Sequence, residues 1–93
     1  MVKILEIRFP KGSKATKAFV DIDIDGIKIC DFRVIQNIGK AYVKAPFTTY
    51  KDENGELHFR QIVDLPAEVR GRIDNAILST FYREMEKTNE QRK

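Results

Sequence analysis

The apolar pattern of this chain changes its period once, and this change limits the fold more than any other feature of the sequence. In residues 2–63, apolar and polar residues alternate in short runs separated by Gly, Pro, Asn and Asp, a pattern typical of β-strands. After Asp64 the apolar residues recur at helical spacing. The order of the two patterns predicts an α+β fold, an antiparallel β-meander of about five strands followed by one C-terminal helix.

The length of the chain limits it to one domain. It has 93 residues, and we assign residues 1–87 to a single α+β domain and residues 88–93 to a polar C-terminal tail. A chain of this size buries only about 60–65% of the surface that its unfolded form exposes, so its core is thin. Small domains with a thin core often bury more apolar surface by associating with a second copy, and we therefore expect a homodimer.

The strongest hairpin signal is the pair Asp25-Gly26, because a type I′ turn needs positive φ at both central residues and this pair tolerates it. With such a turn, Ile29 points to the buried face, and in an unbroken strand Asp31 would point there too. The apolar residue that follows is instead Phe32, in the opposite phase. One extra residue near Cys30-Asp31 restores the alternation, so the sequence predicts a β-bulge there.

Three other elements complete the prediction. Residues 2–9 are expected to form a strand with Leu5, Ile7 and Phe9 on one face. Asn54-Gly55 predicts a second hairpin, and Pro46 marks a strand end, a kink or an edge position. A helix is expected over residues 66–87, with Asp64 as its cap and an apolar stripe that contains Val69, Ile73, Ala76, Ile77, Thr80, Phe81 and Met85.

The sequence holds no pattern typical of nucleophilic catalysis. His58 is the only histidine and Cys30 the only thiol, and no serine or cysteine lies in a Gly-x-Ser-x-Gly context. Free cysteine usually behaves as a small hydrophobic residue, and a lone strand histidine is usually a neutral imidazole. We expect no enzyme, no cofactor and no small-molecule substrate.

Metal binding is expected to be absent as well. Asp21, Asp23 and Asp25 project from one side of a strand, which invites Mg²⁺ or Ca²⁺, but the spacing of a calcium loop and its terminal glutamate are missing. A solvated acidic face that protects a sheet edge is the favoured interpretation. The glycines stand alone at turns, so no phosphate-binding loop is predicted.

Several features indicate a cytoplasmic protein that does not enter a membrane. No apolar run approaches the roughly 20 residues of a membrane span. The first residues begin a strand-like pattern and lack the long apolar core of a signal peptide. A single cysteine, Cys30, allows no internal disulfide, which fits a reducing compartment.

The charge of the chain permits contact with nucleic acid without requiring it. The net charge is +3, and residues 1–20 carry five basic side chains against one acidic one. The candidate phosphate-binding residues are Lys44, Lys51, Arg60, Arg70 and Arg72. The tyrosines next to two of them, Tyr42 and Tyr50, could stack on exposed bases. A solvated basic surface with tyrosines covering the sheet explains the same residues, and composition leaves both interpretations open.

Several segments resemble the stage V sporulation protein G (septation regulator) family. The most specific motif is Asp31-Phe32-Arg33-Val34-Ile35, which matches the family's Asp-(Ile/Phe)-Arg-Val-Ile. It follows an Ala-x-Val-x-(Val/Ile) strand, as in the family. The similar segments are residues 18–22, 29–35, 39–46, 57–63 and 70–84, in the family's order.

This resemblance implies a dimer of β-rich subunits that acts in the bacterial cytoplasm. It implies a role in septation, sporulation or other cell-division and cell-cycle regulation, with DNA binding and, in some members, RNA binding. The chain departs from the family after Pro46, where members usually carry a basic stretch such as Ser-Arg-Lys and this chain has Phe47-Thr48-Thr49. The alternative is a dimeric protein–protein interaction module that does not bind nucleic acid.

Overall fold

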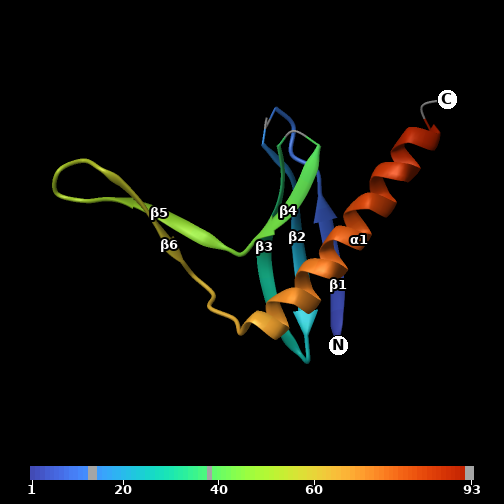
Figure 1. Ribbon diagram of the computed structural model, residues 1–93, viewed down its shortest axis with the longest axis horizontal. Coiled ribbons are helices and arrows are strands. Elements are labelled where there is room, and N and C mark those ends of the chain that lie inside the picture. The colour runs from blue at the N-terminus through green and yellow to red at the C-terminus, as the bar shows by residue number, and fades with distance from the viewer. Residues whose placement is uncertain (13–14, 38, 92–93) are drawn as a thin grey trace.

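The computed structural model describes residues 1–12, 15–37 and 39–91 (Figure 1). Four strands form an antiparallel sheet in the order β1-β2-β3-β4 and two more form a separate ribbon. The chain ends in one helix. The elements are β1 (Val2–Arg8), β2 (Thr16–Ile24), β3 (Ile27–Asn37), β4 (Lys40–Lys44), β5 (Phe47–Lys51), β6 (Leu57–Gln61) and α1 (Ala67–Gln91).

The predicted α+β meander with a C-terminal helix is confirmed, but its strands divide between two sheets instead of forming one sheet of about five. Pro46 lies between β4 and β5 and is buried. Proline has no N–H to give to a β-ladder, so the pairing of the first sheet ends there. The ribbon of β5 and β6 then leads away from the four-stranded sheet (Figure 1).

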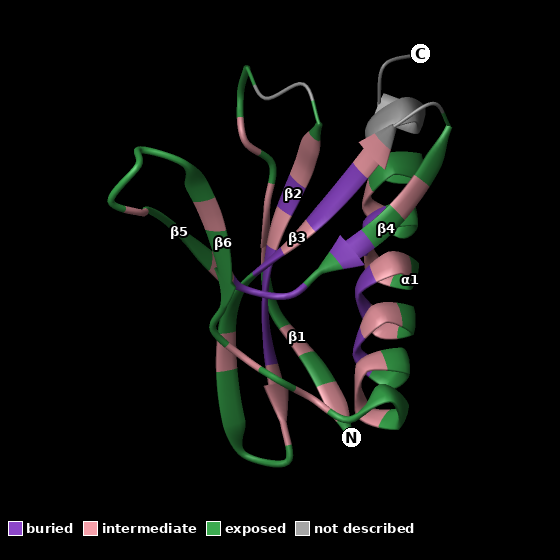
Figure 2. Cartoon of the chain, turned by 60° about the vertical axis from the view of Figure 1, so that its left-hand side comes forward, coloured by how far each residue is buried: buried purple, intermediate pink, exposed green. Residues whose placement is uncertain are grey.

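The core lies between α1 and one face of the four-stranded sheet (Figure 2). The helix contributes Ile73, Ile77 and Phe81, all fully buried, which confirms the centre of the predicted apolar stripe, whereas Met85 near its end is exposed. Burial of side chains of this size stabilises the fold by about 1.5–3 kcal/mol each. The sheet side of the core consists of Ala18, Val20, Ile22, Phe32, Val34, Val43 and Ala45.

The helix begins and ends later than the sequence pattern predicts. Its first intrahelical hydrogen bond joins the Arg70 N–H to the Pro66 carbonyl at 2.9 Å, so Pro66, not Asp64, is the residue just before the helix. At the other end α1 continues to Gln91, into the segment predicted as a tail. Among the described residues, no helix is both long and apolar enough to cross a membrane.

The first strand presents a different face to the core than the alternation predicts. The pairing of β1 with β2 shifts between Ile4 and Glu6, which leaves Leu5 as an extra residue. Ile4 and Ile7 therefore both pack on the core, although residues three apart in a regular strand point to opposite faces. The predicted common face of Leu5, Ile7 and Phe9 is wrong for Leu5, whereas the partly exposed Phe9 lies on the same side as Ile7, with its ring 6.4 Å from that of the buried Phe81.

The bulge predicted in β3 is present. Ile22 pairs with Ile29 and Val20 pairs with Phe32, so Cys30 and Asp31 together oppose the single residue between those partners. Asp31 has a φ of 67°. The type I′ turn at Asp25-Gly26 is confirmed too, with φ angles of 52° and 88°.

The positive φ of Asp31 allows a test, because a bulge and a regular strand predict opposite orders of stability for two substitutions. Asp31→Gly and Asp31→Ala both remove the carboxylate, but only glycine adopts positive φ without steric strain. In chemical denaturation, Asp31→Gly should therefore be the more stable variant by about 1 kcal/mol. In a regular strand the order would be reversed, since glycine there is less stable than alanine. A more stable alanine variant would contradict the bulge.

The outer side of the bulge holds an ion-pair cluster that contradicts the predicted solvated acidic face. β2 is an inner strand, and Asp21 is only 8% exposed. The Arg8 guanidinium donates to both Asp21 carboxylate oxygens, at 2.9 and 3.2 Å, and to Asp31 Oδ1 at 2.9 Å. The Asp31 N–H donates to Asp21 Oδ1 at 3.0 Å, so the buried carboxylate also holds the bulge. The hydrogen bond from Arg8 lowers the pKa of Asp21.

Candidate functional site

The most distinctive feature of the molecule is an arm, defined as β5, β6 and their turn (residues 47–61), which projects from the four-stranded sheet (Figure 1). β5 and β6 pair only with each other in the described part of the chain. At the base of the arm, the Ile62 N–H donates to the Pro46 carbonyl at 3.1 Å. An isolated two-stranded ribbon is only marginally stable in water, so side-chain contacts must hold the arm in place.

The tip of the arm is organised by Asp52. Its Oδ1 accepts hydrogen bonds from the N–H groups of Asn54 and Glu56, both at 2.9 Å. Its Oδ2 lies 2.7 Å from His58 Nε2, and the imidazole stacks on the Tyr50 ring at 5.3 Å. These contacts confirm the predicted hairpin. The hydrogen bond with His58, followed by the one from the Glu56 N–H, lowers the pKa of Asp52.

Asp52, Glu56 and His58 are also the residues here that could hold a metal ion. One ligand atom from each lies within 4.8 Å of the others, and two carboxylates with an imidazole suit a transition metal such as zinc. The Asp52 carboxylate already accepts the hydrogen bonds that shape the turn, which gives this cluster a structural role at the tip.

The base of the arm carries aromatic rings and cations in alternation. The Arg33 guanidinium lies over the rings of Phe19 and Phe47, at 5.3 and 4.3 Å from their centroids. The Lys44 ammonium lies over the rings of Phe47 and Phe59, at 4.6 and 5.2 Å. We call this row, Phe19–Arg33–Phe47–Lys44–Phe59, the cation–aromatic ladder. Each such contact contributes about 0.5–1 kcal/mol at an exposed site, so the ladder also fixes the arm.

The sheet register explains why the ladder forms. Arg33 pairs with Phe19 on one side and with Lys44 on the other, so all three side chains point away from α1. Arg33 and Lys44 carry like charges directly opposite each other, which repel. Both cations lie over the Phe47 ring, and these contacts are attractive. Phe59 then extends the row onto β6, with its ring 5.6 Å from that of Phe47.

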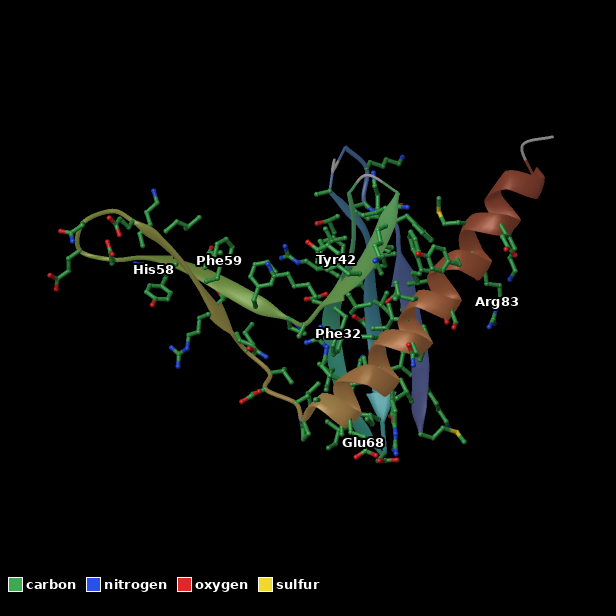
Figure 3. All side chains as sticks on the ribbon, in the orientation of Figure 1. Phe32, Tyr42, His58, Phe59, Glu68 and Arg83 are labelled. Atoms are coloured by element: carbon green, nitrogen blue, oxygen red, sulfur yellow. The ribbon has the colours of Figure 1, made fainter. Side chains whose placement is uncertain are left out.

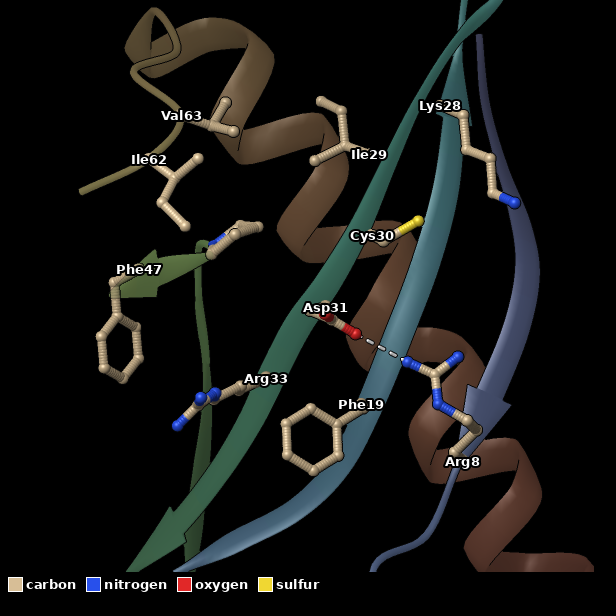
Figure 4. Close-up of a pocket in the computed structure, with 11 residues that line it drawn as sticks. Arg8, Phe19, Lys28, Ile29, Cys30, Asp31, Arg33, Phe47, Ile62 and Val63 are labelled. Atoms are coloured by element: carbon tan, nitrogen blue, oxygen red, sulfur yellow. Dashed lines mark hydrogen bonds and ion pairs between the residues drawn. The ribbon is translucent and has the colours of Figure 1, made fainter. Parts of the chain in front are cut away.

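A groove runs beside the ladder, between the outer face of the sheet and the start of the arm (Figure 4). Its volume is about 520 Å³. Arg33 lies in it between Phe19 and Phe47, and Lys28 lies at its far end (Figure 4). Apolar walls come from Ile29, Pro46, Ile62 and Val63.

The cations of the ladder and the groove lack direct ion pairs in the described part of the chain, although Lys28 is close enough to Asp21 to interact with it electrostatically. Lys28, Arg33 and Lys44 form no ion pair with any residue that the structure describes. Asp31, which also lines the groove, is paired with Arg8. The groove and the ladder therefore combine unpaired cations with flat apolar rings, an arrangement suited to an anionic ligand with aromatic groups.

The five basic residues predicted from the sequence do not form one site. Lys44 belongs to the ladder, and Lys51 lies farther along β5 on the same face of the arm as Phe59. Arg60 pairs with Thr48 and points to the other face of the arm.

The two predicted helix residues both have partners within the fold, and Arg70 also lines a small pocket with Lys44 and Phe47 of the ladder. Arg70 donates to Asp74 Oδ1 at 3.0 Å and to the Val43 carbonyl at 2.8 Å, so it links α1 to β4. Arg72 is paired with Glu68 at 2.9 Å, one turn earlier on α1. Both therefore have structural partners on α1 or β4.

Sequence reasoning missed Arg33, Phe19, Phe47 and Phe59 as site residues. The sequence does contain one indication of a site on the outer face of the sheet, because Phe19 is the only apolar side chain on the outer side of its strand. Phe47 stands where members of the similar family carry a basic stretch, and it occupies the centre of the ladder. The two tyrosines proposed for stacking, Tyr42 and Tyr50, are both exposed.

The chain was compared with known protein families and with curated proteins. No family model matches it, and no curated protein matches it either. The similarity to the stage V sporulation protein G family thus remains a prediction from the motifs described above.

Proposed function

We propose that this protein is a dimeric regulator that binds nucleic acid, DNA or RNA, mainly through phosphate contacts. The cation–aromatic ladder is the observation that carries the proposal. Its cations can neutralise phosphates and release counterions, and its rings can stack on bases. The motif similarity supports a bacterial, cytoplasmic role in septation, sporulation or related cell-division processes.

Phosphate contacts predict a steep salt dependence with weak sequence discrimination. A gel-shift titration with mixed DNA and RNA probes at several salt concentrations tests this directly. The logarithm of the affinity should fall linearly with the logarithm of the salt concentration, with a slope of roughly one per phosphate contact. Tight binding with a flat salt response would contradict the electrostatic mechanism.

Restoring basic residues after Pro46 should strengthen binding. Thr48 and Thr49 are both exposed on β5, so Thr48→Arg with Thr49→Lys adds two cations without disturbing the core. Thr49 lies on the same face of the arm as Phe47 and Phe59, and Thr48 lies on the other face. Binding at low salt should therefore tighten by about tenfold, and the salt slope should rise by about one, from Thr49→Lys. The control is Thr48→Gln with Thr49→Gln, which adds length without charge. Equal affinity of the two double variants would argue against phosphate contacts at this position.

The exposed apolar side chains of the arm favour a second candidate, a dimeric protein–protein interaction module. On one face of the arm Leu57 is 56% exposed and Phe59 is 63% exposed, Tyr50 is exposed on the other face, and Ile62 is exposed just after the arm. Exposed apolar patches of this kind often mark protein contacts. This candidate predicts no binding of either nucleic acid at low salt, whereas the dimer persists.

The same patch leads to a prediction about assembly. Sedimentation at micromolar concentration should give a dimer, because a thin core and a marginally stable ribbon both benefit from a second copy. Leu57→Asp, at the far end of β6, should shift the protein toward monomer, since a buried unpaired charge opposes association. The control is Glu56→Asp in the adjacent turn. A parent protein that stays monomeric across this concentration range would exclude the dimer.

A further inference from the structure

We infer that the ladder and its groove select unpaired nucleotides, so that the protein binds a single strand in preference to a duplex of the same sequence. This inference rests on the proposed function and narrows it to one class of nucleic acid. It applies to DNA and RNA alike, because the contacts involve base faces and phosphates.

The first argument is the accessibility of the Phe59 ring. Phe59, at one end of the ladder, is 63% exposed and projects from the arm (Figure 3). In a duplex, the faces of each base are covered by the neighbouring bases, whereas an unpaired base can stack on a protein ring. The exposed Phe59 ring can therefore contact an unpaired base of a single strand but not the covered base faces of a duplex.

The second argument is the size and shape of the groove. Its volume of about 520 Å³ lies within the roughly 300–1,000 Å³ of pockets that hold small organic molecules. This space suits one splayed-out nucleotide. Phe19 and Phe47 provide apolar walls for a base, and the Arg33 guanidinium between them provides a second flat surface (Figure 4).

The third argument is the position of the charges relative to the rings. Arg33 and Lys44 each lie between two rings, so a strand whose bases stack on the rings would bring its phosphates close to both cations. The negative charge in the groove, Asp31, is held by Arg8 at 2.9 Å, which reduces its repulsion of phosphate.

The start of the helix offers no comparable surface to a duplex. Ile73, Ile77 and Phe81 commit one side of α1 to the sheet. Two basic residues near its start, Arg70 and Arg72, are held by Asp74 and Glu68. A recognition helix needs several free base-reading side chains on one exposed face, and the start of α1 does not supply them.

Fluorescence anisotropy at low salt tests the inference with four labelled probes: oligothymidylate and oligouridylate of about 12 nucleotides, and a mixed-sequence DNA strand alone or annealed to its complement. The single strands should bind at least tenfold more tightly than the duplex. Phe59→Ala should weaken single-strand binding by about tenfold and leave duplex binding unchanged, because stacking is lost. Phe59→Tyr should retain the parent affinity.

Two further variants separate loss of stacking from loss of structure. Phe59→Leu keeps an apolar side chain but removes the ring, so it should behave like Phe59→Ala. Tyr82→Ala removes an exposed ring on α1 and should change no affinity. Equal affinity for strand and duplex, or no effect at Phe59, would overturn the single-strand inference and leave the proposed function standing. Failure of all four probes to bind at low salt would overturn both.

Discussion

Replacement of both ladder cations, Arg33→Gln with Lys44→Gln, should lower nucleic-acid affinity at low salt by about 100-fold. The slope of the logarithm of affinity against the logarithm of salt concentration should become less steep by about two, one for each lost phosphate contact. Both side chains lie on the outer face of the sheet, away from the core, so the four-stranded sheet and α1 should keep their fold, whereas the arm loses the four cation–aromatic contacts that help to fix it. Gel-shift or anisotropy titrations at several salt concentrations measure both quantities.

The matched control removes two cations from α1, Arg72→Gln with Arg83→Gln. Both residues are exposed, and Arg83 projects outward from α1 (Figure 3). The net charge changes by the same amount in the two double variants, so general electrostatic attraction falls equally. A larger loss of affinity in the α1 variant than in the ladder variant would indicate that nucleic acid binds at the helix, where two of the sequence-predicted residues lie, and not at the ladder.

Asp21→Ala should destabilise the protein by about 2 kcal/mol near neutral pH, because it removes an acceptor of charge-assisted hydrogen bonds. Arg8 would lose both of its bonds to Asp21, and the N–H of Asp31 would lose its acceptor at the bulge. Urea denaturation measures the difference in unfolding free energy. The control is Glu6→Ala, since Glu6 is an exposed partner of Arg8 and its removal should change stability by less than about 0.5 kcal/mol.

The effect of Asp21→Ala should depend on pH in a defined direction. Arg8 lowers the pKa of Asp21 in the folded protein below its ordinary value of 3.8. A carboxyl with a lowered pKa stabilises the fold above its unfolded pKa, and this stabilisation disappears as the pH falls through the folded-state pKa. The difference in unfolding free energy between the parent and Asp21→Ala should therefore stay constant at pH values well above 3.8, for example around pH 6. It should shrink as the pH falls below 3.8. A difference that grows in acid would show that the carboxylate opposes folding.

The features that could be predicted from the sequence depend on residues close together in the chain. The turn at Asp25-Gly26 follows from which residues tolerate positive φ, and the bulge follows from a phase change a few residues later. The stripe of Ile73, Ile77 and Phe81 follows from helical spacing alone. In each case the physical constraint acts within one turn or one strand.

The features that could not be predicted depend on which strand lies beside which. Alternation places Asp21 on the outer side of β2 but does not show that Arg8 from β1 covers it. The same limit applies to Phe47, whose role depends on cations from β3 and β4. A side chain's parity is a local property, whereas its burial and its charge partner depend on the whole sheet.

The sequence by itself thus determined the strand and helix pattern, the turn at residues 25–26 and the bulge near Asp31, because backbone sterics and periodicity act locally. Only the tertiary structure decided that the strands form two sheets, that Asp21 is buried beside Arg8, and that Arg33 and Lys44 alternate with phenylalanine rings. These features arise from contacts between distant segments, where pairing register and packing, not local preference, determine each side chain's neighbours.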